Sequence, residues 1–173
     1  MFETPRLILR PMRAEDVDDL LAVFGDPRVM ASFDAEPFDR ARMERWVRRN
    51  LDHQVRYGYG LFTLVLKANG LVIGDCGLER MDEGDVVQAE LGYDLRADCW
   101  NQGLATEAAA AVRDYAYGTL RLPRLISLIR VGNLPSRRVA EKIGMRLEVE
   151  VQRYGHRYWV LALARDDAER VHV

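Results

Sequence analysis

The hydrophobic period of this chain changes at Tyr59, and that change limits the folds the chain can adopt. Upstream, apolar residues recur at the i, i+3, i+4, i+7 spacing of an amphipathic helix. Downstream, three runs with strand character follow one another, at residues 59–67, 71–80 and 86–96. Asn69-Gly70 separates the first two runs with a hairpin-type turn. The sequence therefore predicts helices first and then an antiparallel meander.

The first part of the chain is predicted to contain one strand and two helices. Residues 6–10 alternate polar and apolar side chains and form an edge or early strand that ends at Pro11. A helix carries Val17, Leu20, Leu21 and Phe24 on one face and stops near residues 25–27. Asp39 is the expected N-cap of a second helix, whose buried face holds Met43, Trp46, Val47 and Leu51.

The part after the meander is predicted to be a crossover followed by a closing hairpin. Residues 105–117 form an alanine-rich helix and residues 125–131 a strand, which together make a strand, helix, strand crossover. Residues 133–136 open a short helix that ends at Gly144. Two last strands follow near residues 145–151 and 156–165. The expected fold class is α/β (α+β), with about seven mainly antiparallel strands and about four helices in a single domain over residues 1–173.

Composition narrows the classes of function. A chain of 173 residues with 49% hydrophobic residues can bury one core, and a net charge of -2 gives no general attraction to nucleic acid or to an anionic membrane. Cys76 and Cys99 do not suggest a disulfide framework. The apolar stretch near the start is too short for a signal segment or a membrane span. We expect a cytoplasmic protein with no nucleic-acid or membrane partner.

The segment from Asp98 to Glu107 combines a glycine with a helix start. The first amides of a helix lack intrahelical partners and carry partial positive charge, so a diphosphate can bind there. Gly103 lets the backbone approach an anion, and Ala105 keeps the first turn slim. Taken alone, the same residues also fit an ordinary turn with a capping glycine.

Five segments together resemble one family. They read TPRLILR, IGDCGL, AELGYDL, WNQGLATEA and NLPSRRVAEKIGM, and they occur in the family's order over residues 3–165. The chain resembles the GNAT superfamily of N-acetyltransferases, and within it the RimJ/RimL branch that acetylates ribosomal-protein N-termini. Trp100 and Asn101 depart from the motif's usual Gln or Arg and glycine. The resemblance implies the GNAT fold and acetyl-CoA as cofactor. The three histidines show no metal-ligand spacing, so we expect no metal.

The resemblance also implies which residues bind the cofactor. Backbone groups of Tyr93, Asp94 and Leu95 would pair with the pantetheine arm like an added strand. Asn133 would lie near the pantetheine and Ser136 near the sulfur, although both residue types also cap helices routinely. The remaining expected contacts are Trp100, Asn101, Gln102, Gly103, Leu104, Ala105, Thr106 and Arg138.

Charge is distributed unevenly along the second half. Residues 121–146 hold six arginines and one lysine against Glu141, which suits phosphate groups, a solvated basic face or an RNA contact. Residues 82–98 are acidic and would attract a cationic amine, or they are polar hairpin tips and outward-facing strand residues.

Acetyl transfer to an amine needs a base, a polarised carbonyl and an acid for the leaving thiol. Glu90 is the expected catalytic base, with a solvent-facing or water-holding glutamate as the alternative. Ser136 is the expected catalytic acid, with Tyr154 and Tyr158 as alternatives. A thiol nucleophile paired with His53, His156 or His172 has no local signature.

Three functions remain open at this point. The first is acetylation of a protein N-terminus by direct attack in a ternary complex, and the second is acetylation of a small amine such as a polyamine, amino acid or antibiotic. The third is acyl-CoA binding without turnover. Residues 28–38 and 151–156 are expected to shape the acceptor site. A homodimer through the last strands is suggested by the family alone.

Overall fold

The computed structural model describes residues 1–83, 86–153 and 155–168. Within them, one sheet contains eight strands: β1 (Phe2–Glu3), β2 (Leu7–Pro11), β3 (Leu61–Leu66), β4 (Val72–Glu83), β5 (Val86–Leu95), β6 (Arg124–Arg130), β7 (Arg146–Arg153) and β8 (His156–Ala164). Six α-helices accompany it: α1 (Val17–Phe24), α2 (Pro27–Met30), α3 (Arg40–Tyr57), α4 (Leu104–Gly118), α5 (Leu134–Lys142) and α6 (Arg165–Ala168). A 3-10 turn, η2 (Ala31–Phe33), follows α2.

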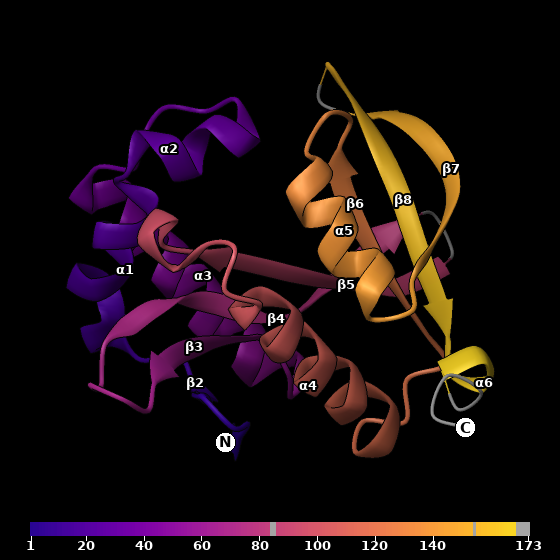
Figure 1. Ribbon diagram of the computed structural model, residues 1–173, viewed down its shortest axis with the longest axis horizontal. Helices are drawn as coiled ribbons and strands as arrows, with labels where there is room; N and C mark the ends of the chain where they lie inside the picture. Colours follow the sequence, from indigo (N-terminus) through magenta and orange to yellow (C-terminus); the bar gives the residue numbers. More distant parts are fainter. Residues whose placement is uncertain (84–85, 154, 169–173) are drawn as a thin grey trace.

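The strands are ordered β1-β2-β3-β4-β5-β6-β8-β7. Every neighbouring pair is antiparallel except β5 and β6, which α4 connects as the expected crossover. In Figure 1, α1, α2 and α3 gather around the first half of the sheet, and α5 lies against β6 and β8. The predicted fold class is therefore confirmed.

The structure has more short elements than the sequence predicts. The two-residue strand β1 pairs with β2, so β2 is not an edge strand. The four-residue helix α2 starts at Pro27 after the N-cap Asp26, in a stretch expected to be a loop. The helix α6 stands where a frayed terminus was expected. Elements of two to four residues are too short to show a hydrophobic period.

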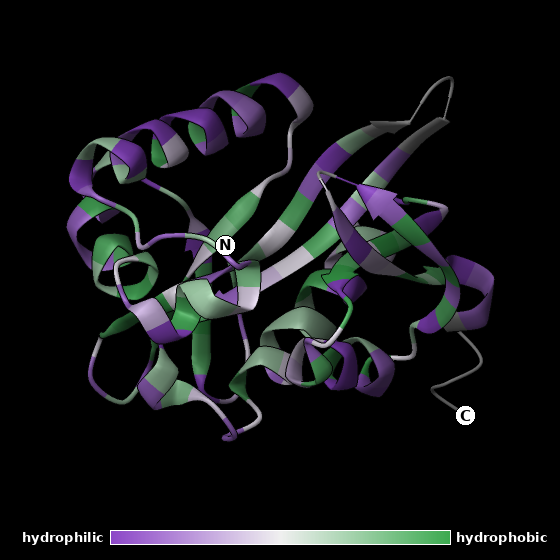
Figure 2. Cartoon of the chain, turned by 90° about the horizontal axis from the view of Figure 1, so that it is seen from above, coloured by the Kyte–Doolittle hydropathy of each residue, from purple (hydrophilic) through white to green (hydrophobic). Residues whose placement is uncertain are grey.

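Two clusters of apolar side chains hold the layers together. One packs α4 and the end of α5 against the sheet, with Ala108, Val112 and Leu125 among its fully buried members. The other packs the N-terminal helices against β3 and β4 through residues such as Leu20 and Met43. Figure 2 shows the resulting polar outer face of the long helix α3. Among the residues described, no helix is long and apolar enough to cross a membrane.

The sheet opens between β5 and β6. These strands are in register only at Ala89 with Leu125 and at Glu90 with Ile126. Beyond those two positions, the described parts of β5 and β6 form no further pairs, and the strands diverge (Figure 1). The amide and carbonyl groups along the free edge of β5 can therefore accept a partner that is not part of the sheet.

Candidate active site

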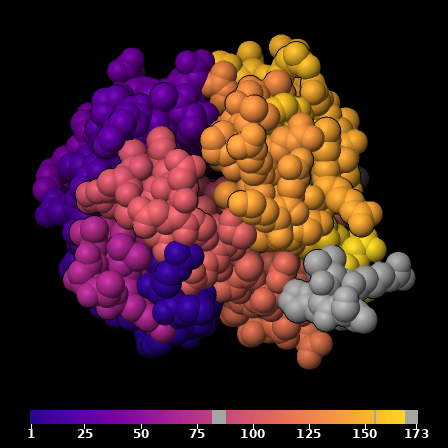
Figure 3. Space-filling model, in the orientation of Figure 1, coloured from indigo at the N-terminus to yellow at the C-terminus, as the bar shows by residue number. Residues whose placement is uncertain are grey.

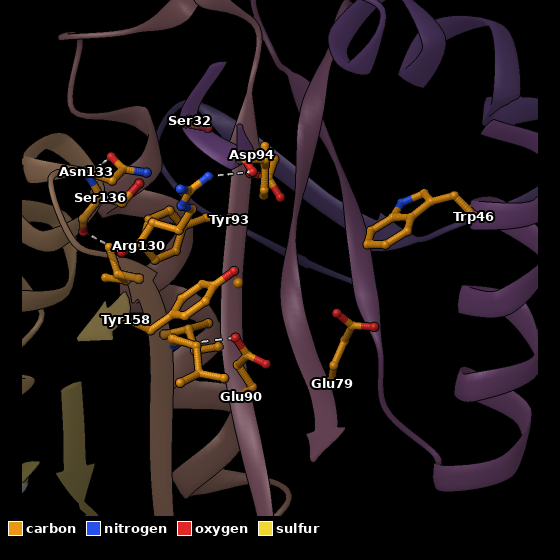
Figure 4. A pocket seen from close by; sticks show the side chains of 15 residues that line it. Ser32, Trp46, Glu79, Glu90, Tyr93, Asp94, Arg130, Asn133, Ser136 and Tyr158 are labelled. Carbon is orange, nitrogen blue, oxygen red and sulfur yellow. Dashed lines mark hydrogen bonds between the residues drawn. The ribbon is translucent and has the colours of Figure 1, made fainter. Parts of the chain in front are cut away.

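A cleft lies where β5 and β6 diverge. Figure 3 shows a hollow between the N-terminal segment and the segment that contains α5, and Figure 4 shows the side chains around it. Its walls come from η2, α3, β4, β5, β6, α5 and β8. The lining residues are Ser32, Phe33, Trp46, Glu79, Glu90, Leu91, Gly92, Tyr93, Asp94, Leu128, Ile129, Arg130, Asn133, Ser136 and Tyr158.

Glu90 lies at the apex of this cleft. Its carboxylate Oε1 accepts a long hydrogen bond of 3.4 Å from the amide of Leu128 on β6. Burial, followed by repulsion from Glu79, raises the pKa of Glu90 to about 7. A carboxyl group with this pKa can exchange a proton readily near neutral pH.

The start of α5 forms the wall opposite Glu90. The side-chain oxygen of Asn133 accepts a hydrogen bond of 3.2 Å from the amide of Ser136, so Asn133 caps the helix, which was one of its two expected roles. The hydroxyl of Tyr93 donates a hydrogen bond of 2.6 Å to the carbonyl of Ser136. Tyr93 was expected to bind the cofactor through its backbone, and its side chain also joins β5 to α5.

Arg130 was grouped with the basic residues of the second half, but it forms part of the cleft wall. Its guanidinium donates a hydrogen bond of 3.0 Å to the carbonyl of Phe33 and lies 3.2 Å from the carboxylate of Asp34. A further contact of 2.9 Å joins it to Nδ1 of His156. Arg130 therefore ties η2 to β6 across one side of the cleft.

Tyr158 and Trp46 also line the cleft, and sequence patterns indicated a role in the site less clearly for both. Tyr158 projects from β8 into the space that Glu90 faces (Figure 4). Trp46 was expected on the buried face of its helix; it packs against the N-terminal core, as expected, and it also lines the cleft. Tyr154 and His172, considered at the sequence level, lie outside the described residues.

The predicted anion-binding turn precedes α4. Gly103 is the N-cap residue of α4 and has a φ of 77°, and Asn101 has a φ of 59°. The amide of Glu107 donates to the carbonyl of Gly103 at 3.0 Å, so the amides of residues 104–106 precede the helical hydrogen-bond ladder. These amides satisfy the first requirement for binding a diphosphate.

Two side-chain hydrogen bonds stabilise this turn. The indole nitrogen of Trp100 donates to the carbonyl of Leu95 at 2.9 Å, and the amide group of Gln102 donates to the carbonyl of Asp98 at 3.0 Å. Leu104 is buried in the core, while Ala105 and Thr106 are partly buried. Trp100 and Gln102 therefore hold the turn in shape with their side chains.

A link between the N-terminal segment and α4 was missed from the sequence. The carboxylate of Glu107 accepts hydrogen bonds from the hydroxyl of Thr4 at 2.6 Å and from the backbone and side chain of Arg6 at 2.8 and 2.6 Å. Arg6 also donates to the carbonyl of Gln102 at 2.8 Å. Although burial raises the pKa of Glu107, these hydrogen bonds outweigh it and lower that pKa.

The expected basic cluster is divided by ion pairs. Arg124 pairs with Glu148, and Arg137 pairs with Glu141 at 2.8 Å while its guanidinium lies 4.7 Å from the centre of the Trp159 ring. Arg138 is exposed on α5. The structure therefore shows no single basic face that includes all the described members of the run.

The other titratable groups considered at the sequence level are engaged or inert. Cys76 and Cys99 are free and buried, and burial raises the pKa of both thiols. The two ring nitrogens of His53 contact the carbonyl of Tyr59 and the amide of Arg80, each at 2.9 Å. In the described part of the chain, no cluster of three or more His, Cys, Asp or Glu residues is arranged to hold a metal ion.

The geometry fits a thioester carrier with a diphosphate. A Cβ added at Gly103 would meet only the Arg6 guanidinium, at 3.5 Å, so the surface over the turn is open to a ligand. The free edge of β5 leads from this turn into the cleft, because Tyr93 to Leu95 lie on that edge. A pantetheine arm can therefore pair with β5 while its diphosphate meets the start of α4.

Comparison with known proteins agrees with this reading. Residues 6–146 match the family model described as an acetyltransferase (GNAT) domain. The uncharacterized N-acetyltransferase p20 of Bacillus licheniformis is 31% identical over 146 residues, which are 84% of this chain and 82% of the relative. The chain therefore belongs to the GNAT family, whose members use acetyl-CoA and act on amine acceptors.

Solved structures with a similar fold include acetyltransferases named for different acceptors. The ribosomal-protein-S5-alanine acetyltransferase of Vibrio fischeri has a TM-score of 0.79 and 17% identity, covering 96% of this chain and 97% of that one. The spermidine N-acetyltransferase of Vibrio cholerae, solved with CoA and spermine, has a TM-score of 0.76 and 14% identity, covering 96% and 99%. At these identities the likeness concerns the fold alone.

Proposed function

We propose that this protein transfers the acetyl group of acetyl-CoA to a primary amine by direct attack in a ternary complex. One observation carries the proposal: Glu90, with a pKa raised to about 7, stands at the point where β5 and β6 part, in the cleft it shares with Ser136. That point is where the free edge of β5 would deliver the thioester. Bound acetyl-CoA supplies an activated acyl group there.

The cofactor is held mainly by backbone groups. The amides at the start of α4 bind the diphosphate, and the edge of β5 binds the pantetheine. The contributing residues are Tyr93, Asp94, Leu95, Trp100, Asn101, Gln102, Gly103, Leu104, Ala105, Thr106, Asn133, Ser136 and Arg138. Trp100 and Gln102 contribute by fixing the turn, as their hydrogen bonds to Leu95 and Asp98 indicate.

Two side chains of the cleft move protons. Glu90 accepts the proton of the attacking nitrogen, directly or through one water, and its pKa near 7 suits this task at neutral pH. Ser136 donates a proton to the leaving sulfur. Tyr158 is the alternative donor, because it lines the same cleft.

The acceptor is the α-amino group of a protein N-terminus, as in the RimJ/RimL branch. Such a group has a pKa of about 7.7 to 8.0, so a sizeable fraction is already neutral near neutral pH, and Glu90 has only to take the proton that the nitrogen loses as it attacks. The fold likeness to a ribosomal-protein acetyltransferase agrees with this assignment.

A small amine is the second candidate acceptor. Arg130 closes one side of the cleft through Phe33 and Asp34, and a closed side favours a small molecule over a long peptide. The fold likeness to a spermidine acetyltransferase agrees with this alternative.

Release of CoA, measured with a panel of N-terminal peptides and a panel of small amines, tests the proposal. We expect release with at least one panel, and the panel that reacts identifies the acceptor class. Acetyl-CoA binding without release for any amine would contradict transfer and would support a binding module instead.

A further inference from the structure

Four carboxyl groups face one another in two pairs on β4 and β5, beside the cleft. In the register of β4 and β5, Glu79 stands opposite Glu90 and Asp75 stands opposite Asp94. Directly opposed residues of an antiparallel pair project from the same face of the sheet, and so do residues two or four positions apart along a strand. All four carboxylates therefore share one face, and three of them line the cleft.

The Asp75–Asp94 pair differs from the Glu79–Glu90 pair in its surroundings. Asp75 is fully buried, and neither of its carboxyl oxygens has a hydrogen-bond partner among the described residues. Burial, Asp94 and Glu79 raise the pKa of Asp75 well above its usual value, although the nearby side chain of Trp46 acts to lower it, and burial and Glu79 raise the pKa of Asp94 to about 7. By contrast, Glu79 pairs with Arg49 at 2.6 Å.

Two carboxylates directly opposite each other repel, so both can be ionised only if a positive charge lies beside them. A proton shared by the pair is one solution. A cation that arrives with a ligand beside Asp94, the member of the pair that lines the cleft, is the other.

The space beside this pair is shaped to admit a ligand. Gly92 lies between Glu90 and Asp94 on β5, and a Cβ added there would meet nothing within 4 Å. The ring of Trp46 lines the adjoining wall (Figure 4), and an aromatic face is a favourable neighbour for an ammonium group. An unobstructed path therefore joins the two carboxylate pairs.

We propose that Asp94, with the buried carboxyl group of Asp75 opposite it, binds a second positively charged nitrogen of the acceptor while its reacting nitrogen lies at Glu90. The inference rests on the proposed function and specifies the acceptor as a primary amine with another cationic group. Glu90 and Asp94 are four residues apart, so their Cα atoms are separated by about 13 Å. An aliphatic diamine and a peptide with a basic residue near its N-terminus share this chemistry.

Matched acceptors separate the second charge from every other property. The small-molecule arm compares 1,4-diaminobutane with butylamine, and the peptide arm compares Ala-Lys with Ala-Gln at the N-terminus. We expect kcat/KM to favour the dicationic member of at least one arm by about 10- to 100-fold, as for a hydrogen-bonded charge. The arm with the preference identifies the source, and equal kcat/KM within both pairs would overturn the inference.

Variants locate the preference. Asp94→Asn should remove most of the preference, measured as the ratio of kcat/KM between the dicationic and the monocationic member of each pair. Gly92→Ala has open space for its new methyl group and should also weaken the dication preference without loss of thermal stability. Glu44→Gln, an exposed change on α3, is the matched control and should leave it intact. A preference that survives both cleft variants would contradict the assignment.

A binding measurement distinguishes the two proposals. Calorimetric titration of 1,4-diaminobutane and of Lys-containing peptide into wild type and Asp94→Asn reports the second site without requiring turnover. Absence of CoA release together with Asp94-dependent binding would reject acetyl transfer and keep the cation site. Release without any dication preference in kinetics or binding would reject the cation site alone.

Discussion

The hydroxyl of Tyr93 donates a 2.6 Å hydrogen bond to the backbone carbonyl of Ser136. This bond links the free edge of β5 to the first turn of α5 across the cleft. Burial raises the pKa of Tyr93, so the hydroxyl stays protonated and remains a donor. The bond therefore fixes the position of Ser136 relative to the strand that would carry the thioester.

Tyr93→Phe removes that bond. We expect a loss of about 0.5 to 1.5 kcal/mol in the free energy of unfolding, as for one hydrogen bond. Turnover should fall as well, because α5 loses its tie to β5. Chemical denaturation and steady-state kinetics measure the two effects. Unchanged stability would show that the bond contributes nothing.

Glu90→Gln tests the catalytic base. For an acceptor amine of low pKa, kcat/KM of the wild type should rise with pH and level off above about 7, where Glu90 is ionised. The variant should lose about 100-fold or more in kcat/KM, together with this pH dependence. A variant that keeps the wild-type pH profile would assign the titration to another group.

Ser136→Ala and Tyr158→Phe compare the two candidate acids. If Ser136 protonates the leaving thiolate, Ser136→Ala should slow turnover with little change in acetyl-CoA affinity, and Tyr158→Phe should have the smaller effect. Pre-steady-state rates and calorimetric titration with CoA separate chemistry from binding. A reversed order of the two effects would assign the acid role to Tyr158.

Gly103→Val tests the turn before α4. The residue has a φ of 77°, which a β-branched side chain adopts only with strain, and the new side chain would occupy the space over the turn. We expect acetyl-CoA affinity to drop by about 10-fold or more, equivalent to about 1.4 kcal/mol. Gly70→Val is the control, because Gly70 has a φ of 72° in the turn between β3 and β4. An equal loss in both variants would indicate strain in the fold alone.

Stability should fall as the pH rises through the acidic range to neutrality. The pKa values of Glu90 and Asp94 are raised to about 7, whereas unfolded carboxyl groups titrate near about 4. Between those values the unfolded chain binds fewer protons than the folded chain, so the free energy of unfolding decreases with increasing pH. Thermal denaturation at several pH values should show this slope, and Asp94→Asn should flatten it. A slope unaffected by the substitution would exclude Asp94 as its source.

Local patterns predicted much of the fold. Asp39 caps α3 by accepting a hydrogen bond of 2.7 Å from the amide of Arg42, as expected from its place before an amphipathic helix. Gly144 follows α5 with a φ of 97°, as expected of a glycine past a helix end. Such features depend on neighbours a few residues away, which a sequence displays directly.

The parts of the site that were missed depend on distant neighbours. Arg130 and Phe33 are 97 residues apart, and their contact exists only because β6 and η2 flank one cleft. The opposition of Asp75 and Asp94 requires the register of β4 and β5, which changes completely with a shift of one residue. Counting charged residues along the sequence could not predict either of these two contacts.

The carboxylate of Glu107 gathers hydrogen bonds from both the hydroxyl of Thr4 and the backbone of Arg6, and Arg6 in turn holds Gln102. The start of the polypeptide and the loop before α4 therefore become ordered as one cooperative unit, though about a hundred residues separate them. Amide exchange at Leu7 in β2 should consequently report on that loop, and protection there should increase when CoA is added.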